Sequence, residues 1–162
     1  MSKKGVAQAL AVLTAGYQRE MTDATIALYV QHLDDIDDRV LSKAIDELLV
    51  RSKFFPSIAD IRERCALVVL GDTLPPDAGV AWGEVWKAVT SEGRFYRPQW
   101  SHPMIAVALE EVGGYYEVCM SSIPEQLRSR FVKAFVRMRD ETIRNVAVSR
   151  WVDDGTPKAL EA

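Results

Sequence analysis

The chain has 162 residues, of which 27% are charged and 48% are apolar, a composition typical of a soluble globular protein rather than of a disordered or fibrous one. This length suits one domain or two small ones with an ordinary buried core. The 20 basic and 23 acidic side chains give a net charge of −3, which excludes a positive field over the whole molecule. Any nucleic-acid site must therefore be local.

Residues 1–70 have the apolar periodicity of amphipathic helices, and we expect them to form an N-terminal four-helix unit. Thr22 can cap the second helix, and Asp37 or Asp38 can cap the third. Gly71 ends the fourth. The expected helices cover about residues 4–15, the segment from Thr22 to Leu33, the segment from Asp37 or Asp38 to Leu49, and residues 58–70.

The N-terminus has a second interpretation, because Lys3 and Lys4 precede an apolar stretch (residues 6–15) in the manner of a secretory signal. Against it, the apolar residues of this stretch fall at helical spacing. Nowhere does the sequence contain the run of about 20 apolar residues that a membrane-spanning helix needs. We expect no membrane contact.

No metal or cofactor site is legible. The two cysteines (Cys65 and Cys119) and the two histidines (His32 and His102) lack the spacing of zinc ligands. The acidic group at residues 34–38 lacks the glycine and the closing glutamate of a calcium loop. Both cysteines lie among apolar residues, where a reduced thiol is expected, and this favours a cytoplasmic location.

Residues 54–61, Phe-Phe-Pro-Ser-Ile-Ala-Asp-Ile, are the most informative stretch of the chain. Pro56 disfavours a helical conformation at the residue before it, so the preceding helix must end. Ser57 can cap the next helix, with Asp60 as its capping-box acid. Adjacent aromatic residues at such a joint either wedge between helices or anchor a partner. Phe54 and Phe55 are therefore candidate partner-binding residues.

The second half of the sequence predicts a linker (residues 71–79), a C-terminal helical unit (residues 80–150) and a polar tail (residues 151–162). Trp82 and Trp86 fall at helical spacing and are expected in the core. Ser101 can cap the next helix. A long helix follows from about residue 125 to about residue 148. Because no stretch alternates like a strand, we predict an all-α fold with two small helical units joined by a Pro/Gly linker.

The long helix is basic: residues 121–150 contain seven basic and three acidic side chains. A helical projection puts four of the basic residues on one side together with Asp140 and Glu141, as on an ordinary solvated face. Together with the bend that carries Arg94 and Arg97, these four are candidates for phosphate contacts. The four residues are Arg130, Lys133, Arg137 and Arg144.

Three other arginines, Arg128, Arg139 and Arg150, are spaced by eleven residues and project among apolar side chains. Charged groups are rarely buried without a partner. These arginines therefore either pair with acids elsewhere in the fold, or dock an acidic protein, or contact DNA phosphates.

For an enzyme, the sequence would have to contain a nucleophile with its base, a defined carboxylate pair or a phosphate-binding glycine loop, and none is legible. We expect no enzyme activity. A catalytic site built from residues distant in the sequence is a third interpretation that only a structure can test.

The stretch from Ser52 to Arg62, with Tyr17 and Tyr29 before it, resembles the folded domain of the phage replicative-helicase loader and inhibitor family, whose recurring element is a Lys-Phe-Pro-Pro-Thr-Ile-Ala-Glu-Ile-Arg-like joint. The second half also resembles phage proteins with that label. Its matching segments are residues 81–85, Gly93 with residues 95–98, 112–114, 119–120 and 130–135.

This resemblance implies an adaptor of phage DNA replication in the host cytoplasm. Such a protein has no ATPase chemistry, binds the hexameric replicative helicase, restrains it, and delivers it to an origin-bound replication protein or to DNA. Phe54, Phe55 and the three arginines at 128, 139 and 150 would supply the contact. The alternative is a DNA-binding replication or regulatory protein that uses the basic last helix.

Overall fold

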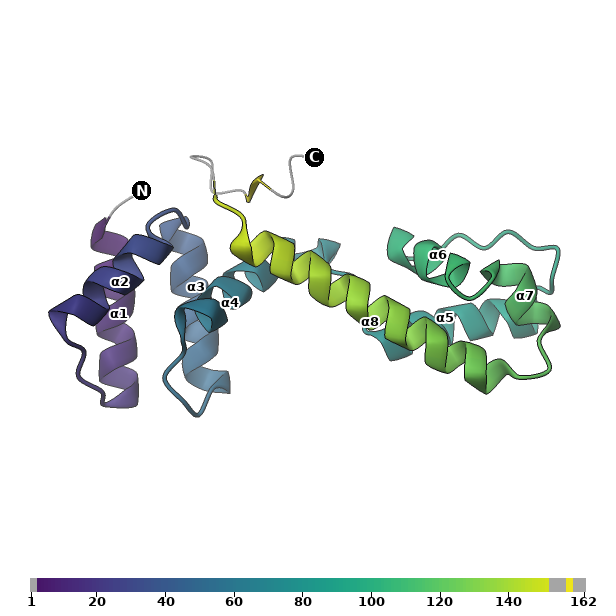
Figure 1. Cartoon of the computed structure of the whole chain (residues 1–162), viewed down its shortest axis with the longest axis horizontal. Coiled ribbons are helices and arrows are strands. Elements are labelled where there is room, and N and C mark those ends of the chain that lie inside the picture. Colours follow the sequence, from purple (N-terminus) through teal and green to yellow (C-terminus); the bar gives the residue numbers. More distant parts are fainter. Residues whose placement is uncertain (1–2, 152–156, 159–162) are drawn as a thin grey trace. The chain divides into compact units, whose positions relative to one another are not determined.

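The computed structural model describes residues 3–151 and 157–158. Its helices are α1 (Lys3–Tyr17), α2 (Asp23–Leu33), α3 (Asp38–Arg51), α4 (Ile58–Leu70), α5 (Ala78–Ser91), α6 (Pro103–Glu110), α7 (Gly114–Met120) and α8 (Pro124–Val148), with a 3₁₀ turn η1 (Gly71–Thr73) after α4 (Figure 1). Within these ranges there is no β-strand, only an isolated bridge between Trp151 and Pro157. The all-α prediction is confirmed. None of the described helices has the length and apolarity to cross a membrane.

The chain divides into two compact units. Unit 1 comprises Met1–Thr73 and Ile143–Ala162, and unit 2 comprises Leu74–Thr142. The sequence placed residues 143–150 with the C-terminal unit, whereas the structure assigns them to unit 1. Helix α8 therefore begins in unit 2 and ends in unit 1. Of the expected tail, residues 152–156 and 159–162 lie outside the described residues.

Side-chain caps start most of the helices. The hydroxyl of Thr22 accepts a hydrogen bond from the backbone of Thr25 at α2. Ser57 and Asp60 form the predicted capping box at α4. At α3 the cap is Asp37. These bonds satisfy backbone N–H groups that a helix leaves without an internal partner.

The predicted cap of α6 is wrong. The side chain of His102 accepts the hydrogen bond from Met104 N at 3.1 Å, and Pro103 is the first helical residue. Ser101 lies one position too early, and both its N–H and its hydroxyl donate to the carboxylate of Glu84 instead. Ser101 thus ties the start of α6 to α5.

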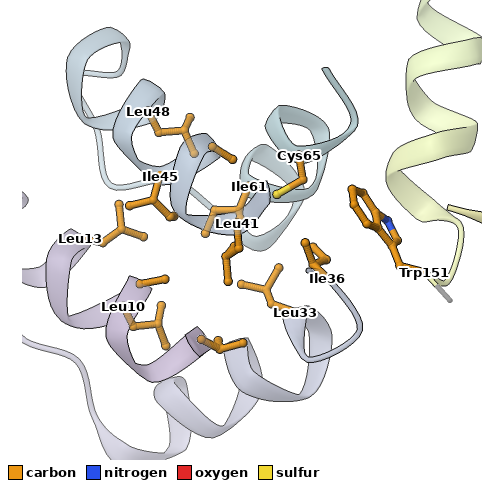
Figure 2. Packing of buried hydrophobic residues seen from close by; sticks show 13 residues of the cluster. Leu10, Leu13, Leu33, Ile36, Leu41, Ile45, Leu48, Ile61, Cys65 and Trp151 are labelled. Carbon is orange, nitrogen blue, oxygen red and sulfur yellow. The ribbon is translucent and has the colours of Figure 1, made fainter. Parts of the chain in front are cut away.

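The core of unit 1 is built from helices α1, α3 and α4, with the end of α2 closing it. Leu13, Leu41 and Ile61 are among its fully buried side chains. Trp151 also belongs to this core, although the sequence placed it in a polar tail, and its ring points toward Ile36 and Cys65 (Figure 2). Residues from both ends of the chain therefore complete one apolar cluster.

Arg62 of α4 holds this arrangement with five hydrogen bonds. Its guanidinium pairs with both carboxylate oxygens of Asp35, at 2.8 and 3.1 Å. It also donates to the carbonyl oxygens of His32, Ala147 and Ser149 at 2.6–2.8 Å. Asp35 in turn accepts the backbone N–H of Trp151 at 3.1 Å. The pair thus joins the end of α2, helix α4 and the chain after α8.

The core of unit 2 is aromatic. Trp82 of α5 lies 5.3 Å, ring to ring, from Phe131 of α8, which stacks on Phe135 at 5.6 Å. Ile105 and Leu109 of α6 complete the cluster. The prediction that Trp82 is a core residue is confirmed, whereas Trp86 stacks on it with part of its ring exposed.

The Asp35–Arg62 pair predicts a measurable dependence of stability on pH. Burial raises the pKa of Asp35, but the hydrogen bonds from Arg62 and from Trp151 N outweigh this and hold that pKa below its ordinary value. The resulting stabilisation is present above the carboxyl pKa of the unfolded chain and is lost as pH falls through the lower pKa of the folded state. We expect Asp35→Asn to lower the free energy of unfolding at pH 7 by about 2–3 kcal/mol, because it removes one partner of a mostly buried pair.

Chemical denaturation between neutral pH and pH 3 measures this effect. Asp34→Asn, at the exposed neighbouring carboxylate, is the matched control and should leave the free energy of unfolding within about 0.5 kcal/mol. Equal effects of the two substitutions would contradict the assigned role of Asp35.

Candidate functional site

The end of α3 exposes two large apolar side chains. Val50 is 88% exposed and Phe54 is 81% exposed. The hydroxyl of Ser52 donates to Phe54 O at 2.8 Å and accepts from Phe54 N at 3.3 Å, so a short turn fixes the backbone below the ring. Arg51 and Lys53 are also exposed and carry positive charge. We call residues 50–54 the exposed segment.

Phe55, the next residue, lies on the other side of the chain and is half-buried. Its ring makes edge contacts with Tyr17 at 5.6 Å and with Tyr29 at 6.3 Å, and it packs against the core of unit 1. The guanidinium of Arg19 lies 5.2 Å from the ring centre. Such cation–π contacts stabilise exposed sites by about 0.5–1 kcal/mol. The two adjacent phenylalanines therefore take the two roles that the sequence left open.

Two tyrosine hydroxyls fix the backbone of the joint. The hydroxyl of Tyr17 lies 3.1 Å from the carbonyl oxygens of both Leu48 and Ser52. The hydroxyl of Tyr29 donates to Pro56 O at 2.9 Å, and burial raises the pKa of this tyrosine. Because these carbonyls flank residues 50–54, the exposed segment is held by packed side chains rather than left as a free loop.

A depression of about 380 Å³ adjoins the joint. Phe55 and Tyr29 form its apolar part, while Arg19 and Glu20 bring opposite charges to its rim. The lining offers no set of titratable groups suited to catalysis. Its chemistry suits the accommodation of a partner's side chain beside the exposed segment.

The three arginines predicted to lie together do not share a surface. Arg128 is exposed and pairs with Glu125 at 3.5 Å on its own helix. Arg139 is half-buried, and its Nε donates to Pro75 O at 3.2 Å within unit 2. Arg150 follows the end of α8 at Val148 and belongs to unit 1. The helical projection therefore does not extend to Arg150.

The other basic residues of α8 divide into two pairs. Arg130 donates to the backbone oxygen of Glu111 at 3.3 Å, and Arg137 forms an ion pair with the carboxylate of the same residue. Lys133 and Arg144 are exposed, with no ion pair to the described residues. Two of the four predicted phosphate contacts are thus engaged within unit 2.

The predicted bend at Arg94 and Arg97 forms a turn after α5. Phe95 in this turn is 82% exposed, and Tyr96 is half exposed. The guanidinium of Arg94 covers the Phe95 ring at 4.8 Å and donates to the sulfur of Met120 at 3.4 Å. Arg97 is exposed.

The sequence did not single out Val50 or Met120 as surface residues. Their apolar character matches the helical pattern of buried positions, and only the ends of α3 and α7 decide that they face solvent. The adjacency of Met120 to an arginine 26 positions earlier also has no local sequence signal.

Among the described residues, no group of three or more His, Cys, Asp and Glu side chains could hold a metal ion. Cys65 and Cys119 are both free thiols. Burial raises the pKa of Cys65 to about 12, so its reactive thiolate is disfavoured at neutral pH.

Residues 1–62 match a protein family that is described as the N-terminal domain of a phage helicase loader and inhibitor protein. The resemblance noted in the sequence is therefore confirmed for these residues, which cover α1, α2, α3 and the first turn of α4. The chain matches no curated protein and no solved structure. The matched region contains the exposed segment and the joint that fixes it.

The contrast between the two phenylalanines gives a direct prediction. Phe55→Ala removes a half-buried ring with three aromatic or cationic neighbours, and we expect it to lower the free energy of unfolding by about 3 kcal/mol. Phe54→Ala removes an exposed ring and should change that free energy by no more than about 0.5 kcal/mol. Urea denaturation followed by circular dichroism measures both. Similar losses for the two variants would show that the ring of Phe54 also packs in the fold.

Proposed function

We propose that this protein is an adaptor of phage DNA replication that binds the hexameric replicative helicase of the host cell, restrains it and helps to load it onto DNA. The observation that carries this proposal is the match of residues 1–62 to the N-terminal domain of a helicase loader and inhibitor. An origin-bound replication protein is a further partner in this scheme, and the host cytoplasm is where these partners meet.

The exposed segment supplies the contact in this proposal. A phenylalanine held by a fixed backbone can enter an apolar pocket without the entropic cost of ordering a flexible loop. Arg51 and Lys53 flank the ring and favour a pocket with an acidic rim. Phe54 is therefore the anchor, and Phe55 positions it by tying the joint to the core of unit 1.

The arginines of the second half play different parts. Arg128 and Arg150 are exposed and can add charges at the rim of an interface, where single contacts contribute little affinity. Arg139 is held by Pro75 and contributes to unit 2 itself. We therefore place the main affinity in unit 1.

The adaptor acts by binding alone. The sequence contains no phosphate-binding loop of the Walker type, so ATP hydrolysis by this chain is not part of the proposal. A protein that binds one conformation of a helicase more tightly than another restrains it in that conformation. Entry of the helicase into its other conformation on DNA then releases the adaptor, because binding and conformational change are reciprocal.

Contact of duplex DNA with the basic face of α8 is the alternative function. The engagement of Arg130 and Arg137 with Glu111 weighs against it, because a carboxylate lies where phosphates would have to bind. Asp140 and Glu141 are exposed on the same helix and add further negative charge.

Mixing the purified protein with the host replicative helicase and ATP, with complex mass measured by light scattering, tests the proposal. We expect a discrete complex. Phe54→Ala should weaken it by about 30-fold or more, as expected for an aromatic anchor. Leu28→Ala, at a half-exposed apolar residue on α2 of the same unit, is the matched control and should leave the affinity unchanged.

A complex that forms equally well with Phe54→Ala would contradict the role of the exposed segment, and the absence of any complex would contradict the adaptor function itself. A salt-sensitive duplex-DNA complex in the absence of helicase binding would favour the alternative.

A further inference from the structure

Unit 2 has its own exposed aromatic surface, which the adaptor function leaves without a role. Its members are Arg94, Phe95, Tyr96 and Arg97 of the turn after α5, and Met120 at the end of α7; we call them the loop surface. Large apolar groups at such exposure are costly unless a ligand covers them.

Hydrogen bonds and ring contacts fix the backbone of this turn. Gly93 has a φ of +78°, a conformation that other residues adopt only with strain. Its carbonyl oxygen accepts from Tyr96 N at 3.2 Å and from the hydroxyl of Tyr115 at 3.3 Å. The ring of Tyr115 in turn contacts Trp100 at 5.9 Å. The turn is thus tied to α7 and to the chain that leads into α6.

The charged groups of the loop surface are also placed. Met120 Sδ accepts a hydrogen bond from Arg94 Nη1 at 3.4 Å, and the guanidinium lies over the Phe95 ring at 4.8 Å. Two arginines therefore flank two exposed rings within four consecutive residues. An aromatic ring offers a face on which an unstacked base can lie, and a guanidinium matches the geometry of a phosphate.

We propose that the loop surface binds single-stranded nucleic acid. Phe95 and Tyr96 stack on successive bases, while Arg94 and Arg97 contact the phosphates between them. A single strand is the occupant that fits, because stacking on an exposed ring needs a base that is free of its own helix. The function goes beyond helicase binding and gives the adaptor a direct contact with the strand on which a helicase is loaded.

The charge distribution bounds the properties of this site. Glu92 and Glu117 lie on the elements that carry the turn, and the whole chain is acidic, so the positive region is short. With two phosphate contacts, the logarithm of affinity should fall with the logarithm of salt concentration with a slope of about −1.4. Stacking tolerates any base, so little sequence preference is expected.

Fluorescence anisotropy with a labelled oligo-dT of about 15 nucleotides and the purified full-length protein tests the proposal. We expect binding at low salt that Phe95→Ala weakens by about ten-fold or more, and that Phe95→Tyr retains because the stacking face remains. Arg97→Ala should weaken binding and reduce the salt slope.

Phe54→Ala is the matched control, since Phe54 is as exposed as Phe95 but belongs to unit 1, and it should leave the affinity for oligo-dT unchanged. Unaltered binding by Phe95→Ala, equal affinity for duplex of the same length, or no binding at low salt would each overturn the proposal. Loss of helicase binding by Phe95→Ala with no effect on oligo-dT would instead assign the loop surface to a protein. Because the oligo-dT assay contains no helicase, its failure leaves the adaptor function standing.

Discussion

The guanidinium of Arg62 uses all five of its N–H groups, and the architecture of unit 1 depends on where they point. Paired with Asp35, it satisfies a carbonyl at the end of α2 and two more near the end of α8, groups that a helix end leaves without partners. The same carboxylate then receives the N–H of Trp151, whose ring enters the core (Figure 2). One ion pair therefore brings the last part of α8 into the domain that the first 73 residues build.

This constraint also bears on function, because Arg62 lies one turn into the helix that the joint at Pro56 begins. With α4 fixed at Arg62 and capped at Ser57, the chain before it can turn only in the way that buries Phe55 and exposes Phe54. The joint thus converts two identical neighbours into a structural residue and a contact residue. Unit 2 repeats the device in a different form, with Phe95 exposed by a turn that Tyr115 fixes.

Much of the fold could be predicted from the sequence because its signals are local: the apolar periodicity, the capping box at Ser57 and the helix stop at Pro56 each involve a few neighbouring residues. The cap of α6 was misplaced by one residue because serine and histidine compete for the position, and the outcome depends on Glu84, 17 residues before Ser101. The roles of Asp35 and Trp151 were missed for the same reason, since their contact spans 116 residues. For the site, the aromatic pair was visible, but which ring faces solvent depends on Tyr17 and Tyr29, which no local pattern links to the joint. The family resemblance added the partner, which packing alone does not indicate.

Contact between unit 1 and a replicative helicase through the exposed segment is the central claim. Hydrogen exchange of the full-length protein, measured by mass spectrometry with and without the hexameric helicase, tests it most directly. The backbone amides of residues 52–55 lie at the surface beside Phe54, so we expect the helicase to slow their exchange, while peptides from the buried face of α3 change little. A complex in which residues 50–55 exchange as fast as in the free protein, with the slowing confined to unit 2, would contradict this claim.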